Sequence, residues 1–270
     1  MTPENLLNHL DSGTPWPTRA QGSMRPSLDA AYASALAVRA LRIARGEQPR
    51  GFKIGFTNRT IWPRYNVYAP IWGTVWDSTL QHGESGGESE CTVSLAHTCQ
   101  PRLEPEIVFG MKFTPAPNAT LDQLFDSLAW VAPGFEVVQS HLPGWKFDAA
   151  DTVADSGLHA RLVVGQHIPV NELAPDANAL DELLAQARVT LYRDQQAVEE
   201  GLGSNVLGSP LRALQHFLTT LRACPGAPDL QPGDVVTTGT WTDAWPLRPG
   251  EQWQARFSLP GFQLALHTTA

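Results

Sequence analysis

The sequence predicts an α+β fold that is rich in β-strands and carries a few flanking helices. The chain has 270 residues with 22 prolines, 22 glycines and 9 tryptophans, a composition typical of many turns between short strands. Most apolar runs are short and bounded by these turn residues, as strands are. The helical patterns are fewer and carry their own start and stop signals. With 42% hydrophobic residues, the chain is long enough to bury a sizeable core.

Charge and cysteine content exclude several classes of protein. The net charge of -8 argues against general nucleic-acid binding, which needs a basic surface, although a local basic pocket for a small anion stays open. Three cysteines without CxxC spacing indicate free thiols in a reducing compartment. The N-terminus lacks the pattern of a signal peptide, and no apolar run is long enough to span a membrane. We therefore expect a cytoplasmic protein that binds neither nucleic acid nor membrane.

The N-terminal part of the chain is predicted to be helical. Residues 1–15 are typical of a short amphipathic helix or arm. A longer helix begins after Ser27, a favourable N-cap, and ends at Gly46. Neither repeats nor linker-like segments interrupt the rest. The simplest organisation is an N-terminal helical extension over residues 1–50, packed on one structural unit over residues 51–270.

The remaining elements follow from short apolar runs and their flanking turns. We expect strands at residues 51–56, 70–77, 102–109, 132–140, 160–164, 183–194 and 235–238, and paired strands after residue 249. Helices are expected at residues 120–129 and 211–223, with a helix cap in the acidic segment 148–155 and a polar loop at 81–90. The glycine-rich segment 201–208 lacks the pattern of a P-loop or a dinucleotide fold, so nucleotide binding is not predicted there.

The run from Arg102 to Phe109 carries two carboxylates on one apolar strand. Glu104 and Glu106 are two residues apart, so their side chains point to the same face of a strand. Two like charges held close among apolar neighbours are costly, because desolvation and mutual repulsion both oppose ionisation. Either one carboxyl is protonated, or a hard divalent cation such as Mg²⁺, Mn²⁺ or Ca²⁺ lies between them. On the pair alone, two surface glutamates on a solvated edge strand are the simpler interpretation.

A third acid strengthens the metal hypothesis. Glu136 lies in the apolar run 132–140, where a lone acid needs a partner. The run follows Glu106 at a distance that lets an intervening helix return the chain to the same sheet. Three acids on strands that can converge predict a metal site better than two. Lys53, in the strand predicted at 51–56, is either an exposed residue or an inward cation that holds a carboxylate.

Several segments together resemble one enzyme family. They are residues 51–58, the Glu104-Pro105-Glu106 strand, residues 135–138, residues 151–155 and residues 230–240. In order and spacing they resemble the 2-keto-4-pentenoate hydratase and 4-oxalocrotonate decarboxylase branch of the fumarylacetoacetate hydrolase superfamily. The similarity runs from roughly residue 27 to residue 266. It implies a rolled mixed β-sheet like the C-terminal domain of that superfamily, and a homo-oligomer, a dimer or higher.

The resemblance implies a divalent metal, Mg²⁺ or Mn²⁺, held by Glu104, Glu106 and Glu136. These are the acids already singled out by the strand pattern. In the family, the metal chelates a small 2-keto acid substrate through its carboxylate and keto oxygens. A metal in that position acts as a Lewis acid and stabilises an enolate.

The same resemblance implies roles for four further residues. Lys53 and Asp77 match the family's catalytic lysine and aspartate. Lys53 would orient the metal shell, or hydrogen-bond to substrate and water, and Asp77 would move protons at the enol carbon. The turn at Gly239 and Thr240 would present backbone N–H groups to the substrate carboxylate.

The implied activity is that of a hydratase, a lyase of aromatic-ring catabolism. It adds water to a 2-hydroxy-2,4-dienoate, through the 2-keto tautomer, and forms a 4-hydroxy-2-keto acid. One alternative is a decarboxylase of a 2-oxo-enedioate on the same metal site. Another is a hydrolase of an acylpyruvate C–C bond, which would use His82 and Glu84 to activate water. A non-catalytic partner subunit is a further alternative, which the intact set of acids with Lys53 and Asp77 disfavours.

One segment departs from the hydratase pattern. Residues 156–160 read Ser-Gly-Leu-His-Ala, where the family has a polar run rich in Asn and Ser that lines the substrate pocket. His159 is therefore a candidate substrate contact, or else a structural histidine. Residues 62–72 are unusually aromatic, consistent with a bulkier or different substrate. Arg59 and Arg64 are expected at the surface, with a second anion contact as the alternative.

Overall fold

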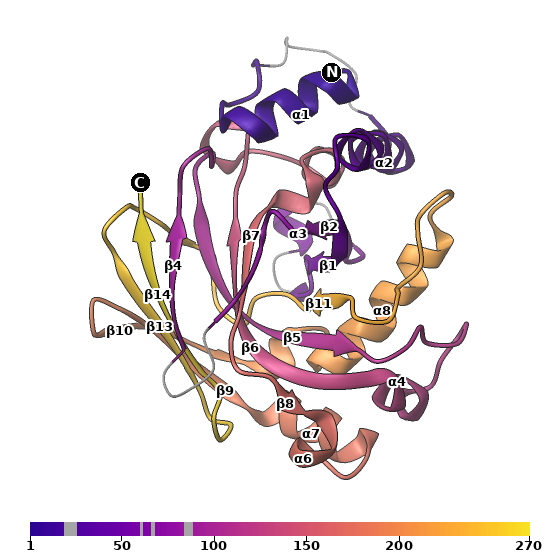
Figure 1. Cartoon of the computed structure of the whole chain (residues 1–270), viewed down its shortest axis with the longest axis vertical. Coiled ribbons are helices and arrows are strands. Elements are labelled where there is room, and N and C mark those ends of the chain that lie inside the picture. The colour runs from indigo at the N-terminus through magenta and orange to yellow at the C-terminus, as the bar shows by residue number, and fades with distance from the viewer. Residues whose placement is uncertain (19–25, 60–61, 66–67, 84–88) are drawn as a thin grey trace.

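The computed structural model describes residues 1–18, 26–59, 62–65, 68–83 and 89–270, and it confirms the predicted mixed α+β fold. Two curved sheets form the body of the molecule, with helices around them (Figure 1). The larger sheet is mixed: β1 runs parallel to β11 and β3 parallel to β7, whereas the central pairs are antiparallel. No helix among the described residues is long and apolar enough to cross a membrane.

The larger sheet has nine strands, and its main path runs β2-β1-β11-β5-β6-β7-β3. Its members are β1 (Pro49–Gly55), β2 (Ile71–Trp76), β3 (Leu80–His82), β5 (Arg102–Met111), β6 (Leu128–Val138), β7 (His159–Val164), β8 (Ile168–Pro169), β11 (Val235–Thr237) and β12 (Trp245–Pro246). The central strands β5 and β6 are nearly all buried, which explains why their sequences are almost continuously apolar.

The smaller sheet has five strands in the order β10-β9-β13-β14-β4. Its members are β4 (Ser89–Ser94), β9 (Arg188–Arg193), β10 (Gln196–Leu202), β13 (Gln252–Phe257) and β14 (Gln263–Thr269). Buried and exposed residues alternate along β13 and β14, as they do in a sheet with one solvated face. The buried side joins the main core, where Trp241 and Trp253 are among the largest fully buried side chains.

Helices and short turns cover the sheets. They are α1 (Pro3–Ser12), α2 (Leu28–Ala44), α3 (Trp62–Tyr65), α4 (Leu121–Ser127), α5 (Ala149–Ala154), α6 (Val170–Leu173), α7 (Ala177–Gln186) and α8 (Pro210–Ala223), with 3-10 turns at Pro143–Trp145, Ser156–Leu158 and Gly203–Asn205. The expected caps are present, since the hydroxyls of Ser27 and Ser209 accept hydrogen bonds from the third residue of α2 and α8. Asp148 likewise caps α5.

The strand predicted over residues 183–194 is correct only in its second half. Its first residues belong to α7, which Asp176 caps by accepting a hydrogen bond from the Ala179 N–H. The buried residues of α7 include Leu180 and Leu184, one helical turn apart, so a single apolar face packs on the core. The prediction missed this helix because it passed over the cap at Asp176. The strand predicted at 132–140 begins earlier, at Leu128, directly after α4.

A small apolar cluster and a chain of ion pairs join the two N-terminal helices to each other. Leu6, Trp16 and Val38 form the cluster. In the ion-pair chain, Asp11 of α1 binds Arg45, and Arg45 binds Glu47. Because β1 begins at Pro49, the residues before it precede both sheets. A boundary at residue 50 stays a prediction.

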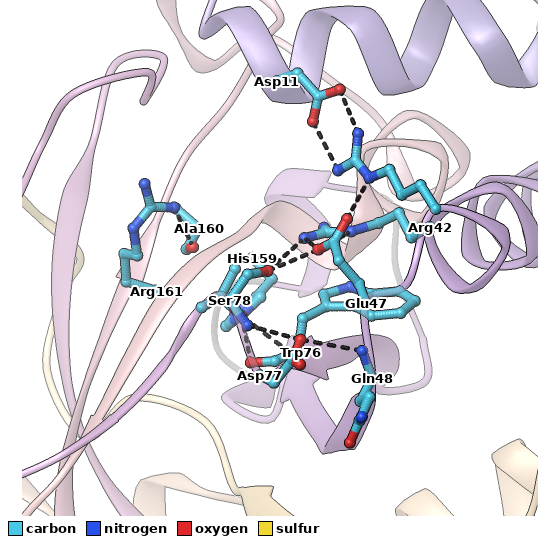
Figure 2. Close-up of polar contacts among 12 residues, drawn as sticks. Asp11, Arg42, Glu47, Gln48, Trp76, Asp77, Ser78, His159, Ala160 and Arg161 are labelled. Atoms are coloured by element: carbon cyan, nitrogen blue, oxygen red, sulfur yellow. Dashed lines mark hydrogen bonds and ion pairs between the residues drawn. The ribbon is translucent and has the colours of Figure 1, made fainter.

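Glu47 joins α2 to the turn that follows β2. Its Oε2 accepts hydrogen bonds from Arg42 Nε at 2.9 Å and from Ser78 Oγ at 2.6 Å (Figure 2). The Arg42 guanidinium lies over the Trp76 ring at 4.4 Å. Burial raises the pKa of the Glu47 carboxyl, but the bonds from Arg42 and Ser78 outweigh it and hold the pKa at about 2.

Replacing Glu47 with Gln should flatten the acid side of the stability profile. The folded pKa lies below the ordinary 4.5, so the carboxylate contributes stability above pH 4.5 that is lost as the pH falls toward about 2. Urea denaturation should give wild type a higher free energy of unfolding than Glu47→Gln near neutral pH. The difference between the two should shrink as the pH falls. The exposed Glu172 of α6 is a matched control, and its Gln variant should show no such trend. A constant difference for Glu47→Gln would contradict the assignment.

Candidate metal and substrate site

Glu104, Glu106 and Glu136 converge where β5 pairs with β6. Glu104 lies directly opposite Glu136 in the ladder, and Glu106 is two residues further along the same face. Each acid offers one oxygen, and these oxygens lie within 4.8 Å of one another. Glu106 and Glu136 are completely buried, whereas Glu104 is partly exposed. The structure thus brings together the three acids that the sequence pattern singled out.

Glu106 has one oxygen bound by the protein and one oxygen left available. Its Oε2 accepts a hydrogen bond from the Gly239 N–H at 2.6 Å and another from the Thr237 hydroxyl. Its Oε1 is buried and has no hydrogen-bond partner among the described residues. A buried carboxylate oxygen without a donor is costly. A cation at this point would remove that cost.

Glu136 is held from both sides. Its Oε1 lies 2.8 Å from His159 Nδ1, and its Oε2 lies 3.0 Å from Lys53 Nζ. Lys53 is 2% exposed, so the sequence alternative of an exposed lysine is wrong. Its strand β1 places it opposite Gly73 of β2 and beside Thr237 of β11.

The acids outnumber the cation that faces them. Burial raises the pKa of Glu106 well above its usual range, and repulsion from Glu136 and Glu104 adds to the effect. Burial also raises the pKa of Glu104, to about 7, although Lys53 opposes the shift. Burial lowers the pKa of Lys53, but attraction to Glu136 and the other two acids outweighs it and raises the pKa overall. One ammonium therefore leaves excess negative charge, which a divalent ion would neutralise.

A pocket of about 970 Å³, part of it open to solvent, lies over this cluster. Lys53 and Glu104 belong to its lining. Apolar and aromatic walls come from five separate segments, namely Phe56, Ile71, Val138, Trp145 with Phe147, and Leu158. Arg102 supplies a second cation and lies 4.2 Å over the Trp145 ring. The pocket thus combines charged groups with apolar and aromatic walls, as small-molecule sites do.

Gly239 and Thr240 line the pocket, but the Gly239 N–H donates its hydrogen bond within the protein. It binds Glu106, so its effect is to fix an acid of the cluster. Only glycine fits here, because φ is +103° and a Cβ would lie 1.9 Å from Thr57 Oγ1. The predicted carboxylate contact by this N–H is therefore not supported.

Asp77 is not brought to the pocket. It is exposed in the turn after β2, where its Oδ1 accepts hydrogen bonds from the backbone N–H of Gln48 at 3.0 Å and of Ser78 at 2.9 Å (Figure 2). The ladder places Trp76 opposite Pro49, at the end of β1 away from the pocket. This position does not support the predicted proton-transfer role.

His159 is buried behind Glu136 and is absent from the described pocket lining. The predicted substrate contact is therefore not supported for this residue, whereas its neighbours Gly157 and Leu158 do line the pocket. Arg59 is exposed, and His82 contacts His167 at 3.3 Å away from the lining. Glu84 and the side chain of Arg64 lie outside the described residues.

Sequence reasoning missed the distal wall of the pocket. The sequence could have predicted Arg102, because a residue two positions before Glu104 must share its face of the strand. It could not have predicted Trp145 and Phe147, since they lie on an irregular segment whose path is set by tertiary bonds. The Trp145 Nε1–H donates to the Gln100 carbonyl at 3.0 Å, and the Gly144 N–H donates to Gln100 Oε1 at 2.8 Å.

Comparison with known proteins yields a consistent group of relatives. The family model for the fumarylacetoacetate hydrolase C-terminal domain matches residues 78–263. A 2-hydroxyhexa-2,4-dienoate hydratase of Comamonas testosteroni is 33% identical over 84% of this chain and 81% of its own length. A 4-oxalocrotonate decarboxylase of a Pseudomonas species is 32% identical over 77% of this chain and 75% of its own.

A solved structure shares the fold over nearly the whole chain. The 4-oxalocrotonate decarboxylase from Pseudomonas putida G7, complexed with magnesium and adipate, superposes with a TM-score of 0.85. It is 23% identical, and the match covers 98% of this chain and 95% of that chain. The likeness shows that the rolled mixed sheet with its flanking helices is a known architecture.

Glu104 should make the metal-free protein less stable as the pH rises. Its folded pKa of about 7 exceeds the ordinary 4.5, so its favourable contribution is complete below pH 4.5 and is lost as the pH rises through about 7. We expect the stability of wild type minus that of Glu104→Gln, measured by urea denaturation in EDTA, to fall over this interval. Taking the difference removes the contribution of the histidines.

Adding Mn²⁺ should abolish that loss. An ion that binds only the folded protein adds about 2.7 kcal/mol of stability at a hundred times its Kd. We expect this gain to grow as the acids ionise and to be much smaller in Glu104→Gln. If the stability of wild type minus that of Glu104→Gln rises with pH in EDTA, the assigned direction of the Glu104 pKa shift is wrong.

Proposed function

This chain belongs to the fumarylacetoacetate hydrolase family, and we propose that it is a divalent-metal-dependent hydratase of a 2-hydroxy-2,4-dienoate. The product is a 4-hydroxy-2-keto acid. The observation that carries the proposal is the cluster of three carboxylates beside one ammonium, at the floor of a pocket with apolar and aromatic walls. The relative from Comamonas testosteroni, named as a hydratase of such a dienoate, supports this substrate class.

The residues present fit a hard divalent ion. Glu104, Glu106 and Glu136 would hold Mg²⁺ or Mn²⁺ through oxygen atoms, and the buried Glu106 Oε1 has no other partner among the described residues. When bound, such an ion polarises a keto group and favours the enolate form of a 2-keto acid.

The protein's own groups bind the substrate and handle its protons. Lys53 lines the pocket next to the acids, so its ammonium is placed to hydrogen-bond to a substrate oxygen or to deliver a proton. Water adds across a double bond of the keto tautomer: its oxygen bonds to carbon 4 and the neighbouring carbon takes the proton. Ile71, Val138 and Leu158 supply apolar wall for the carbon chain of the substrate.

A decarboxylase of a 2-oxo-enedioate is the second candidate. Arg102 favours it, because a cation in the pocket lining suits a second carboxylate. A relative and a structural neighbour are both named as decarboxylases. The acylpyruvate hydrolase has less support, since His82 is not in the described lining of the pocket. We retain a homo-oligomer and a cytoplasmic location as proposals.

Two substrates distinguish the leading candidates. Incubation of the Mg²⁺-loaded protein with 2-hydroxypenta-2,4-dienoate should remove the dienol absorbance without releasing CO₂. Incubation with 2-oxohex-3-enedioate should release little CO₂. Rapid CO₂ release from the second substrate, with the first unchanged, would replace the hydratase by the decarboxylase. Full activity in excess EDTA would refute the metal dependence.

Replacing Lys53 with Met should lower kcat by a factor of about 10² to 10⁴, the usual contribution of a positioned proton donor. Mn²⁺ binding should persist, because the three acids remain. Glu106→Gln should instead lose both Mn²⁺ binding and activity. The exposed Lys112 is a matched control whose Met variant should keep wild-type turnover. An unchanged kcat for Lys53→Met would remove this lysine from the site.

A further inference from the structure

We propose that Thr79 and His159 position Glu136 from behind and thereby set the affinity of the acid cluster for its metal. The inference rests on the proposed metal site, but it concerns residues for which no part in that site is assigned. His159 lies in the segment 156–160, which departs from the hydratase pattern. Thr79 lies in the turn after β2, and both side chains are buried.

His159 connects the acid to the turn through its two ring nitrogens. Nδ1 lies 2.8 Å from Glu136 Oε1, and Nε2 lies 2.8 Å from Thr79 Oγ1. An ionised carboxylate only accepts hydrogen bonds, so Nδ1 carries the proton toward Glu136. In a neutral imidazole Nε2 then accepts, so the single proton of the Thr79 hydroxyl goes to Nε2 at 2.8 Å rather than to the Trp76 carbonyl at 3.2 Å. That carbonyl already accepts a hydrogen bond from the Thr79 N–H. Thr79 therefore fixes both the tautomer and the orientation of the ring.

Thr79 is itself held at three points. Its hydroxyl accepts a hydrogen bond from the Trp76 N–H at 3.1 Å, and its own N–H donates to the Trp76 carbonyl at 3.0 Å. Its carbonyl accepts from the Leu162 N–H of β7 at 2.8 Å, and Leu162 lies opposite Glu136 in the sheet. The hydroxyl is thus fixed relative to the strand that carries the acid.

The exposed side of the turn is anchored to the N-terminal region (Figure 2). Asp77 accepts hydrogen bonds from the N–H groups of Gln48 and Ser78, and the Ser78 hydroxyl donates to Glu47. Asp77, although far from the pocket, therefore helps to set the position of Thr79. A continuous path of hydrogen bonds runs from this turn through the imidazole to the acid.

This arrangement resembles the outer support that protein metal sites use. A ligand whose remaining oxygen is fixed by a hydrogen bond loses less freedom when the ion binds. Here Oε1 of Glu136 is fixed by His159, which leaves Oε2 to the cation side, where Lys53 lies. His159 is not among the described residues that line the pocket. It therefore acts as a positioning residue, through its contact with Glu136.

Titration with Mn²⁺, followed by loss of the EPR signal of the free ion, tests the proposal without substrate. Thr79→Val removes the hydroxyl at nearly constant volume, and we expect its Kd for Mn²⁺ to rise about 10-fold, the low end for loss of such support. His159→Leu should raise the Kd by about 10- to 100-fold. Thr79→Ser, which keeps the hydroxyl, should restore affinity close to that of wild type.

Thr152 is the matched control. It is also a buried threonine, its hydroxyl donates to the Ala149 carbonyl within α5 at 2.8 Å, and its Val variant should bind Mn²⁺ as wild type does. Wild-type affinity in Thr79→Val would overturn the proposal even if His159→Leu failed to fold. So would an equal loss in Thr152→Val, which would indicate a general effect of lost buried hydroxyls.

The same titration separates this inference from the proposed function. If wild type binds Mn²⁺ and hydrates the dienoate while Thr79→Val matches it in Kd, only the positioning role is wrong. If wild type does not bind Mn²⁺, the metal site and the positioning role are both wrong.

Discussion

The structure depends on a charge imbalance at its centre. Three carboxylates converge on the junction of β5 and β6, and Lys53 is the only ammonium bound to them among the described residues. Burial, with added repulsion from the neighbouring acids, raises the pKa values of Glu104 and Glu106. Folding stability is lost to create a site that favours a divalent cation. A cluster that costs stability in this way is typical of a functional site.

The scaffold around the cluster is built to keep it rigid. Antiparallel pairing of the two longest strands, β5 and β6, sets Glu104 opposite Glu136. Thr237 at the end of β11 and Gly239 just after it donate hydrogen bonds to Glu106. Lys53 reaches the acids from β1 and His159 from the start of β7. Because all of these contacts except that of Gly239 come from strands of one sheet, small relative motions are resisted by many backbone hydrogen bonds. The pocket's distal wall is less regular, since Trp145 and Phe147 lie on an irregular segment while Arg102 begins β5.

The pocket wall and the acid cluster determine different properties of the site. The acid cluster and Lys53 are compatible with hydration, decarboxylation or hydrolysis, because each of these reactions uses an enolate stabilised by a metal. Arg102, Trp145 and Phe147 line the pocket and, under the proposed function, would shape the space for the far end of the substrate. The choice among substrates therefore belongs to this wall, whereas the acids determine the chemistry that the substrates share.

Sequence alone determined the α+β class, most strands and caps, and the three acids, because strand periodicity places i and i+2 on one face and a buried charge needs a partner. The strand pattern left Lys53 open between an exposed residue and an inward cation, and only the family resemblance implied its place in the site. The sequence could not place Asp77. This residue matches the family motif, but it lies in the turn after β2, beside the end of β1 that is away from the pocket. The sequence also left His159 open between substrate contact and structural residue. Only the tertiary structure decided these points. Long-range strand pairing sets which side chains meet, and a local sequence pattern does not reveal that pairing.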